Sequence, residues 1–397
     1  MSGPAPEPGR DPCVAALWPA PVRLAASTGG APSRAGYLPL PSARAPRLLL
    51  PWPHPRAAAR AVASTRRFGA AALGAALRCG LADRLLTERL HVLAPDGVAT
   101  IEEWLAGLLG RELAVAVRLG PPRANRKPVL HLMTPRGATL AFAKLAANAL
   151  TAELVRAEAA ALRTLAAAPL RHTRVPGVLA LSEWHGRPLL VLEALPVPGP
   201  ELTRRPARLR ACLAEIAAAQ GTHTAPLLGC AYLKDLYRDL DGLAARGPEA
   251  AEPAAALRAV LDGLPDVELA FGGWHGDLTR GNLAPHRTGV LVWDWERYRQ
   301  GVPVGFDALH LRLQDMVSAR GRAGPADTTA LCASAGRLLR PFGVAPAAAG
   351  VVAALYLTEI AVRYLRDRQD DVGAPVAGIG RWLLPPLRRH VRTLRPR

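Results

Sequence analysis

Residues 274–282 read Trp-His-Gly-Asp-Leu-Thr-Arg-Gly-Asn. It places a carboxylate at Asp277 and an amide at Asn282, five residues later. A turn at His286–Gly289 follows, and the apolar run Val-Leu-Val-Trp at 290–293 then ends in Asp294. An apolar run of this kind predicts a short strand that returns Asp294 to the loop holding the other two side chains.

These three side chains are suited to one kind of chemistry. Transfer of a phosphoryl group to a hydroxyl needs a carboxylate that orients the hydroxyl and accepts its proton. It also needs oxygen ligands that hold Mg²⁺ against the phosphates, and amide and carboxylate oxygens serve this purpose. The spacing therefore indicates an ATP-dependent phosphotransferase site.

The pattern His-Gly-Asp-x-x-x-x-Asn, followed by a strand and Asp294-Trp295-Glu296, resembles the aminoglycoside phosphotransferase and choline kinase superfamily, which shares the protein-kinase fold. The resemblance covers roughly residues 112–390 and is concentrated in 272–310. It implies that Asp277 is the catalytic base and that Asn282 and Asp294 are the Mg²⁺ ligands.

The same resemblance implies two supporting roles. His275 would shape the catalytic loop, and Asp307, which follows Gly301-x-Pro303, would brace it. The block WDWERYRQGVPVGFDALH at 293–310 is also similar to a subgroup of actinobacterial phosphotransferase-like proteins.

Upstream of the motif the sequence predicts a small sheet. Short apolar segments at 113–119, 129–134 and 139–145 are separated by Pro- and Gly-containing turns and predict three antiparallel strands. A helix is expected over 149–167, followed by two more strands within 175–184 and 187–195.

The expected fold is therefore α+β, a bilobal protein-kinase-like fold. It has a small five-stranded antiparallel N-lobe with one helix at residues 111–195 and a larger, mainly helical C-lobe at residues 196–397. Residues 1–110 would be an N-terminal extension.

The N-lobe should supply the remaining contacts to the nucleotide. A kinase-like site needs a cation on the third strand, and Lys144 stands there although the chain has only three lysines. Glu158 on the following helix is the favoured partner and Glu153 the rival. The segment that contains Glu193 and Leu195 fits a hinge whose backbone groups would pair with adenine.

The loop between the first two of these strands is poor in glycine. Residues 119–128 contain one glycine and three cations, Arg123, Arg126 and Lys127. Two readings are open: these cations contact phosphates, or they are solvated loop residues.

The N-terminal extension divides into two parts. Residues 1 to about 50 are dense in Pro, Gly, Ser and Ala and predict an irregular or partly disordered arm. One or two helices are expected over 57–90, because Gly69, Gly74 and Gly80 disfavour a single long one. A capping box at Thr100–Glu103 should open a short helix that ends near Gly110.

The composition limits other functions. The formal net charge is +18, but arginine dominates and is scattered, without the basic run and interleaved aromatics typical of nucleic-acid binding. Five widely spaced cysteines without a C-x-x-C pair disfavour a zinc or disulfide framework. Motifs of P-loop proteins, serine hydrolases and zincins are missing from the sequence.

The sequence also favours a cytoplasmic protein without a membrane span. The N-terminus MSGPAPEPGRDP lacks the pattern of a signal peptide. The apolar run 342–357 contains Pro346, is followed by Glu359, and predicts a buried helix.

Together these features predict transfer of the γ-phosphate of ATP, with Mg²⁺, to a hydroxyl of a small molecule. A sugar or glycoconjugate intermediate is favoured over an antibiotic-like cation, because the protein is basic. A peptide Ser/Thr kinase of a biosynthetic pathway and a nucleotide-binding pseudokinase or scaffold are the alternatives.

Overall fold

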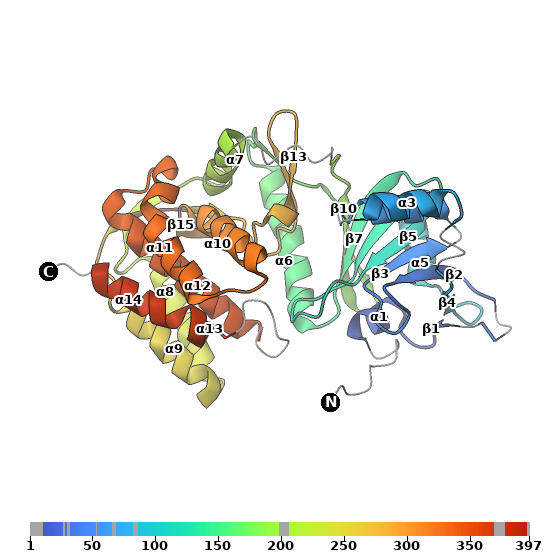
Figure 1. Ribbon diagram of the computed structural model, residues 1–397, viewed down its shortest axis with the longest axis horizontal. Coiled ribbons are helices and arrows are strands. Elements are labelled where there is room, and N and C mark those ends of the chain that lie inside the picture. The colour runs from blue at the N-terminus through green and yellow to red at the C-terminus, as the bar shows by residue number, and fades with distance from the viewer. Residues whose placement is uncertain are drawn as a thin grey trace. The chain divides into compact units, whose positions relative to one another are not determined.

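The computed structural model describes residues 11–26, 28–29, 32–52, 54–65, 69–81, 86–197, 206–368 and 378–394. The chain forms two compact units (Figure 1). Unit 1 comprises Met1–Ala159 with Gly177–Ala194, and unit 2 comprises Ala160–Pro176 with Leu195–Arg397. The first ten residues of the expected N-terminal arm lie outside the described residues.

Unit 1 is built on an antiparallel sheet with the strand order β1-β4-β2-β3-β5-β6-β7-β10-β9. The strands are β1 (Arg23–Ala25), β2 (Ala35–Leu40), β3 (Leu48–Trp52), β4 (Leu90–Leu93), β5 (Ala114–Arg118), β6 (Val129–Met133), β7 (Thr139–Leu145), β9 (Val178–Trp184) and β10 (Arg187–Glu193). The helices are α1 (Pro12–Leu17), α2 (Pro55–Ala63), α3 (Ala70–Arg78), α5 (Ile101–Leu109) and α6 (Ala149–Ala166), the last of which runs on into unit 2. The five expected strands are neighbours in this sheet, and the expected α+β class is confirmed.

The irregular arm expected over residues 1–50 is wrong where the structure describes it. β2 and β3 form a hairpin with Leu38 opposite Leu50, and β3 pairs with β5. The apolar side chains of this segment, among them Tyr37 and Leu49, are almost completely buried. Their burial stabilises strands despite the prolines. The boundary expected at residue 110 therefore lies inside unit 1.

Alternate residues of the strands enter two separate cores, as the two-residue period of a strand requires. Leu38, Leu50 and Ala116 pack with α2 and α3 on one face. Tyr37 and Leu49 pack with α1 and α5 on the other. The sheet is thus covered on both faces.

The predicted helix signals are present at the expected places. Thr100 and Glu103 form the capping box at the start of α5, and Gly110 ends this helix in a left-handed conformation. In the described part of the 57–90 region lie the helices α2 and α3, and Gly69 stands at the N-terminus of α3.

Unit 2 is mainly helical and carries two small sheets. Its helices are α7 (Pro206–Ala218), α8 (Ala231–Ala244), α9 (Pro248–Leu261), α10 (Phe306–Arg320), α11 (Pro325–Leu339), α12 (Pro346–Arg366), α13 (Ile379–Trp382) and α14 (Leu384–Leu394), with the 3₁₀ turns η3 (Arg280–Asn282) and η4 (Arg340–Phe342). One sheet joins β11 (His223–Pro226), β12 (Glu268–Trp274) and β15 (Arg299–Pro303), and the other joins β13 (Leu283–Pro285), β14 (Val290–Val292) and β8 (Thr173–Arg174).

Helix α12 is the central element of unit 2. It contacts α8, α9, α10, α11 and α14, and most of its side chains are buried in their common core. Among the described residues it is the one helix that length and composition would allow to cross a membrane, but 78% of the apolar stretch is buried inside the protein. This burial agrees with the buried helix expected from the sequence.

Candidate functional site

In unit 1, Lys144 and Glu158 form a buried ion pair. Nζ of Lys144 on β7 lies 2.7 Å from both carboxylate oxygens of Glu158 on α6. Lys144 is 5% exposed and Glu158 is fully buried, whereas the rival Glu153 is exposed. A lysine held on both oxygens of one carboxylate has a fixed position, with its charge at a defined point above the sheet.

The loop between β5 and β6 is tied to the N-terminal segment of the same unit. The guanidinium of Arg126 lies 2.8 Å from the carboxylate of Asp11, and its Nε donates to the carbonyl oxygen of Leu119 at 2.8 Å. Arg126 therefore anchors the loop within unit 1. Neither sequence-based hypothesis, phosphate contact or a solvated cation, predicted this role. Arg123, by contrast, lies exposed.

The predicted hinge begins at the end of β10. The backbone N–H of Glu193 donates to the carbonyl oxygen of Gly177 at 2.8 Å, and the carboxylate of Glu193 accepts from the N–H of Gly177 at 3.2 Å. Leu195 belongs to unit 2, and its carbonyl oxygen accepts from Val197. The adenine contact remains a prediction.

In unit 2, strand β12 leads directly into the loop 275–282, and Asp307 at the start of α10 holds this loop by its backbone. Its carboxylate accepts from the N–H of His275 at 2.7 Å and from the N–H of Gly276 at 3.3 Å. Gly276 has φ = 85°, and a Cβ there would lie 2.3 Å from the carbonyl oxygen of Arg297, so only glycine fits this position. Burial raises the pKa of Asp307 to about 7, although the hydrogen bonds from the two backbone amides act to lower it.

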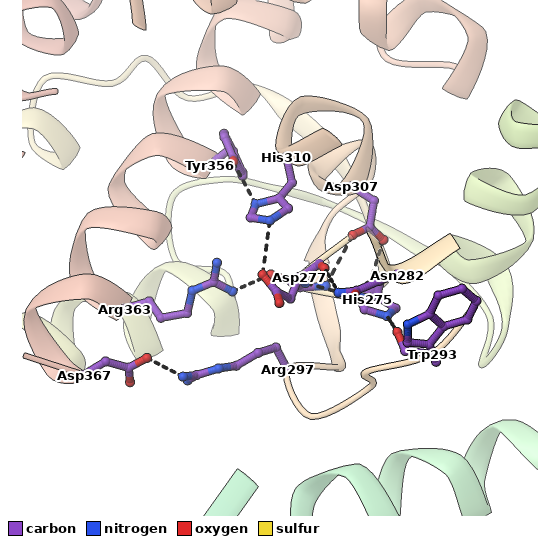
Figure 2. Close-up of polar contacts among 11 residues, drawn as sticks. His275, Asp277, Asn282, Trp293, Arg297, Asp307, His310, Tyr356, Arg363 and Asp367 are labelled. Atoms are coloured by element: carbon purple, nitrogen blue, oxygen red, sulfur yellow. Dashed lines mark hydrogen bonds and ion pairs between the residues drawn. The ribbon is translucent and has the colours of Figure 1, made fainter. Parts of the chain in front are cut away.

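His275 connects the loop to the strand that delivers Asp294. Its Nε2 lies 3.0 Å from the carbonyl oxygen of Trp293, and its Nδ1 accepts from the N–H of Asp277 at 3.2 Å (Figure 2). A ring that accepts at Nδ1 and donates at Nε2 is neutral. Burial agrees with this, because it lowers the pKa of His275 to about 4.

Asn282 and Asp294 are brought together by the β13–β14 hairpin. Leu283 pairs with Val292, and the N–H of Trp293 donates to the carbonyl oxygen of Asn282 at 3.2 Å. Asp294, the next residue, has φ = 67°, a left-handed conformation that Asp tolerates better than most residues. The hairpin thus returns Asp294 to the end of the loop, as the sequence predicted.

The side chain of Asn282 is oriented by the loop itself. Its Nδ2 donates to the carbonyl oxygen of Asp277 at 2.9 Å. The amide oxygen is then the atom that Asn282 can offer to a cation. With the carboxylate of Asp294 it makes a hard oxygen donor set, which suits Mg²⁺.

Asp277 lies between two side chains that the sequence did not reveal. Nε2 of His310 is 3.5 Å from Oδ1 of Asp277, and Arg363 donates to the carbonyl oxygen of neighbouring Gly276 (Figure 2). Burial alone would raise the pKa of Asp277, but His310 and Arg363 outweigh it and hold the pKa well below its usual value. The carboxylate is therefore ionised at neutral pH.

Helix α12 presents a polar stripe to this region. Tyr356, Glu359, Arg363 and Asp367 follow one another at steps of three and four residues, so they share one face. Glu359 pairs with Arg299 at 2.9 Å, and Asp367 pairs with Arg297. The spacing of these polar residues within an apolar helix is a sequence signal for a polar face. The prediction of a buried helix did not include such a face.

Replacement of Asp307 by Asn should loosen the loop 275–282. Asn offers one oxygen instead of two and turns an NH₂ group towards one of the two backbone donors. Because an unpaired buried donor costs about 1–3 kcal/mol, we expect a lower melting temperature and slower ATP turnover. The control is Asp235→Asn, whose side chain is 57% exposed. Equal melting temperature and turnover in the Asp307 and Asp235 variants would show that this brace is dispensable.

Residues 124–305 match the phosphotransferase enzyme family. No curated protein matches the chain. The matched segment contains Lys144, Glu158, Asp277, Asn282 and Asp294, whereas Asp307, His310 and Arg363 lie beyond its end.

Several solved structures are similar at low identity. A thermostable mutant of aminoglycoside phosphotransferase APH(4)-Ia, in complex with ADP and hygromycin B, is 15% identical, covers 74% of this chain and 99% of its own, and has a TM-score of 0.45. A choline/ethanolamine kinase family protein from Mesorhizobium loti is 17% identical, covers 71% and 87%, and has a TM-score of 0.41. The amicoumacin kinase hAmiN is 15% identical, covers 68% and 85%, and has a TM-score of 0.38.

Proposed function

We propose that this chain, whose residues 124–305 match the phosphotransferase enzyme family, transfers the γ-phosphate of ATP to a hydroxyl of a small molecule. The observation that carries this proposal is the assembly in unit 2 of an ionised Asp277 with Asn282 and the end of β14. These are the groups that phosphoryl transfer requires, and the chain retains each of them.

In the proposed reaction Asp277 acts on the acceptor. Its carboxylate orients the hydroxyl for attack on the γ-phosphorus and takes the proton as the new P–O bond forms and the bond to ADP breaks. Because its pKa is low, orientation is the larger part of this role. Mg²⁺, held by Asn282 and Asp294, would neutralise charge on the phosphates.

The residues of unit 1 would hold the nucleotide. Lys144, steadied by Glu158, would contact the α- and β-phosphates. The backbone between Glu193 and Leu195 would pair with adenine, as the resemblance implies.

The acceptor is proposed to be neutral or anionic, such as a sugar or a glycoconjugate intermediate. Three carboxylates follow the motif closely enough to attract a cationic acceptor, and each is already engaged or buried. Asp307 binds two backbone amides, Asp315 forms a two-point pair with Arg280 at 3.1 and 3.0 Å, and Glu296 is only 7% exposed. This favours an uncharged or negative hydroxyl compound over an aminoglycoside-like cation.

A thermal-shift measurement with ATP and MgCl₂ should be followed by incubation with γ-labelled ATP and pooled small hydroxyl metabolites, with mass identification of labelled products. Stabilisation and a labelled small molecule are the expected results. A labelled peptide pool instead would favour the peptide-kinase alternative. Stabilisation without any transfer or hydrolysis would favour a pseudokinase, and absence of both effects would refute the proposal. The cytoplasmic location remains a prediction, which fractionation of the native cells would test.

A further inference from the structure

His310 is a completely buried histidine that contacts the proposed base. It lies on α10, one helical turn after Asp307, with 0% of its surface exposed. Its two ring nitrogens face two different groups. Nε2 lies 3.5 Å from Oδ1 of Asp277, and Nδ1 lies 3.0 Å from the hydroxyl oxygen of Tyr356 on α12 (Figure 2).

The surroundings of His310 determine its protonation state. Burial and the nearby Arg363 lower its pKa, which outweighs the opposite effect of Asp277. The ring of Trp274 lies nearly perpendicular to the imidazole, with 6.5 Å between the two ring centroids. The imidazole is therefore neutral and carries a single N–H.

The hydroxyl of Tyr356 selects which nitrogen carries that hydrogen. Burial raises the pKa of Tyr356 well above its usual value, so the hydroxyl keeps its proton and can donate it to Nδ1. The N–H of His310 then lies on Nε2 and points to the carboxylate. The opposite tautomer would aim a lone pair at an anion, which is unfavourable.

From this geometry we propose that His310 is a positioning residue for Asp277: its Nε2–H faces Oδ1 at 3.5 Å, a distance longer than a normal hydrogen bond, and leaves Oδ2 to take the acceptor hydroxyl, while Tyr356 holds the imidazole in the required tautomer. The role rests on the proposed function. It concerns residues beyond the segment that matches the family. A donor that faces one carboxylate oxygen favours one orientation of the carboxylate, so its effect falls on orientation of the hydroxyl more than on binding.

Kinetics of phosphate release from Mg·ATP, with water as the acceptor, test this role. His310→Leu keeps an apolar side chain beside Trp274 but removes the donor, and it should lower kcat about 10- to 100-fold with little change in KM for ATP. His310→Gln places an amide N–H near the position of Nε2 and should recover a large part of the loss. His172→Leu, at an exposed histidine, is the control and should behave as the wild type.

A double variant separates positioning from general damage to the fold. If His310 acts through Asp277, then His310→Leu should change kcat less than about twofold in an Asp277→Asn background. If the reductions in kcat of the two single variants multiply in the double variant, the proposal is overturned. An increase in KM for ATP with unchanged kcat in His310→Leu would also overturn it. So would a Gln variant as slow as the Leu variant.

NMR of the full chain labelled with ¹⁵N-histidine identifies the tautomer of His310 independently of enzymatic activity. The signals that vanish in His310→Leu belong to His310 and should show a hydrogen on Nε2 and none on Nδ1. Tyr356→Phe should shift this balance, and Asp277→Asn should shift the Nε2 resonance. A hydrogen on Nδ1 in the wild type would overturn the inference even if ATP is hydrolysed. Absence of hydrolysis in a wild type that shows the expected tautomer would instead count against the proposed function.

Discussion

Asparagine at position 277 should lower the rate of phosphate transfer by about 10³-fold, within the range expected for loss of a positioned proton acceptor. The amide of Asn has nearly the shape of the carboxylate, but it cannot take the proton of the hydroxyl. Rates of ADP formation with and without acceptor, measured at saturating ATP, give the effect on kcat.

The fold should survive this change. The loop contacts near Asp277 use its backbone: the N–H donates to His275 and the carbonyl oxygen accepts from Asn282. Stabilisation of the variant by Mg·ATP should therefore equal that of the wild type. Asp96→Asn, at a fully exposed side chain of unit 1, is the control. A rate within tenfold of the wild type for Asp277→Asn would mean that another group accepts the proton.

Removal of the charge at Lys144 should produce the second large effect, on both stability and turnover. Lys144→Met removes the ammonium group from the buried carboxylate of Glu158, and breaking one side of a buried pair costs about 3–5 kcal/mol. We expect a melting temperature several degrees lower and kcat/KM for ATP reduced by at least about 100-fold, because the phosphates lose their cation.

The double variant Lys144→Met, Glu158→Leu separates the two effects. Two apolar side chains of similar volume should restore much of the melting temperature, since replacement of a buried ion pair is often neutral or stabilising. Turnover should stay as low as in the single variant. Recovery of turnover together with stability would show that Lys144 serves the fold and that a different cation holds the phosphates.

The local motifs were predicted well because their signals are short in range. The strands β5, β6 and β7, the capping box of α5 and the hairpin before Asp294 each follow from turn residues and two-residue periodicity within a few positions. The partner of Lys144 was also correctly chosen. Both residues stand on adjacent elements, so few alternatives existed.

The sequence did not predict the strands β2 and β3 of the N-terminal segment, because their formation depends on partners distant in the chain. Prolines at 39, 41 and 51 are typical of loops, and the sequence alone does not reveal that Leu49 will pair with Val117. The energy that overrides the local preference comes from burial against β5, β6 and α5, elements 50 or more residues further along the chain.

The amino-acid sequence by itself determined which groups the proposed chemistry uses: the order and spacing of Lys144, Glu158, Asp277, Asn282 and Asp294 place each group on its element, because short-range backbone preferences are encoded locally. Only the tertiary structure decided what surrounds the base. His310 and Arg363 lie 33 and 86 positions beyond Asp277, and Tyr356 holds His310; these side chains come together because α10 and α12 pack in one core. The buried neighbours of a carboxylate, which set its charge and orientation, depend on this packing: the spacing of polar residues along α12 marks a polar face, but it does not show which group that face meets.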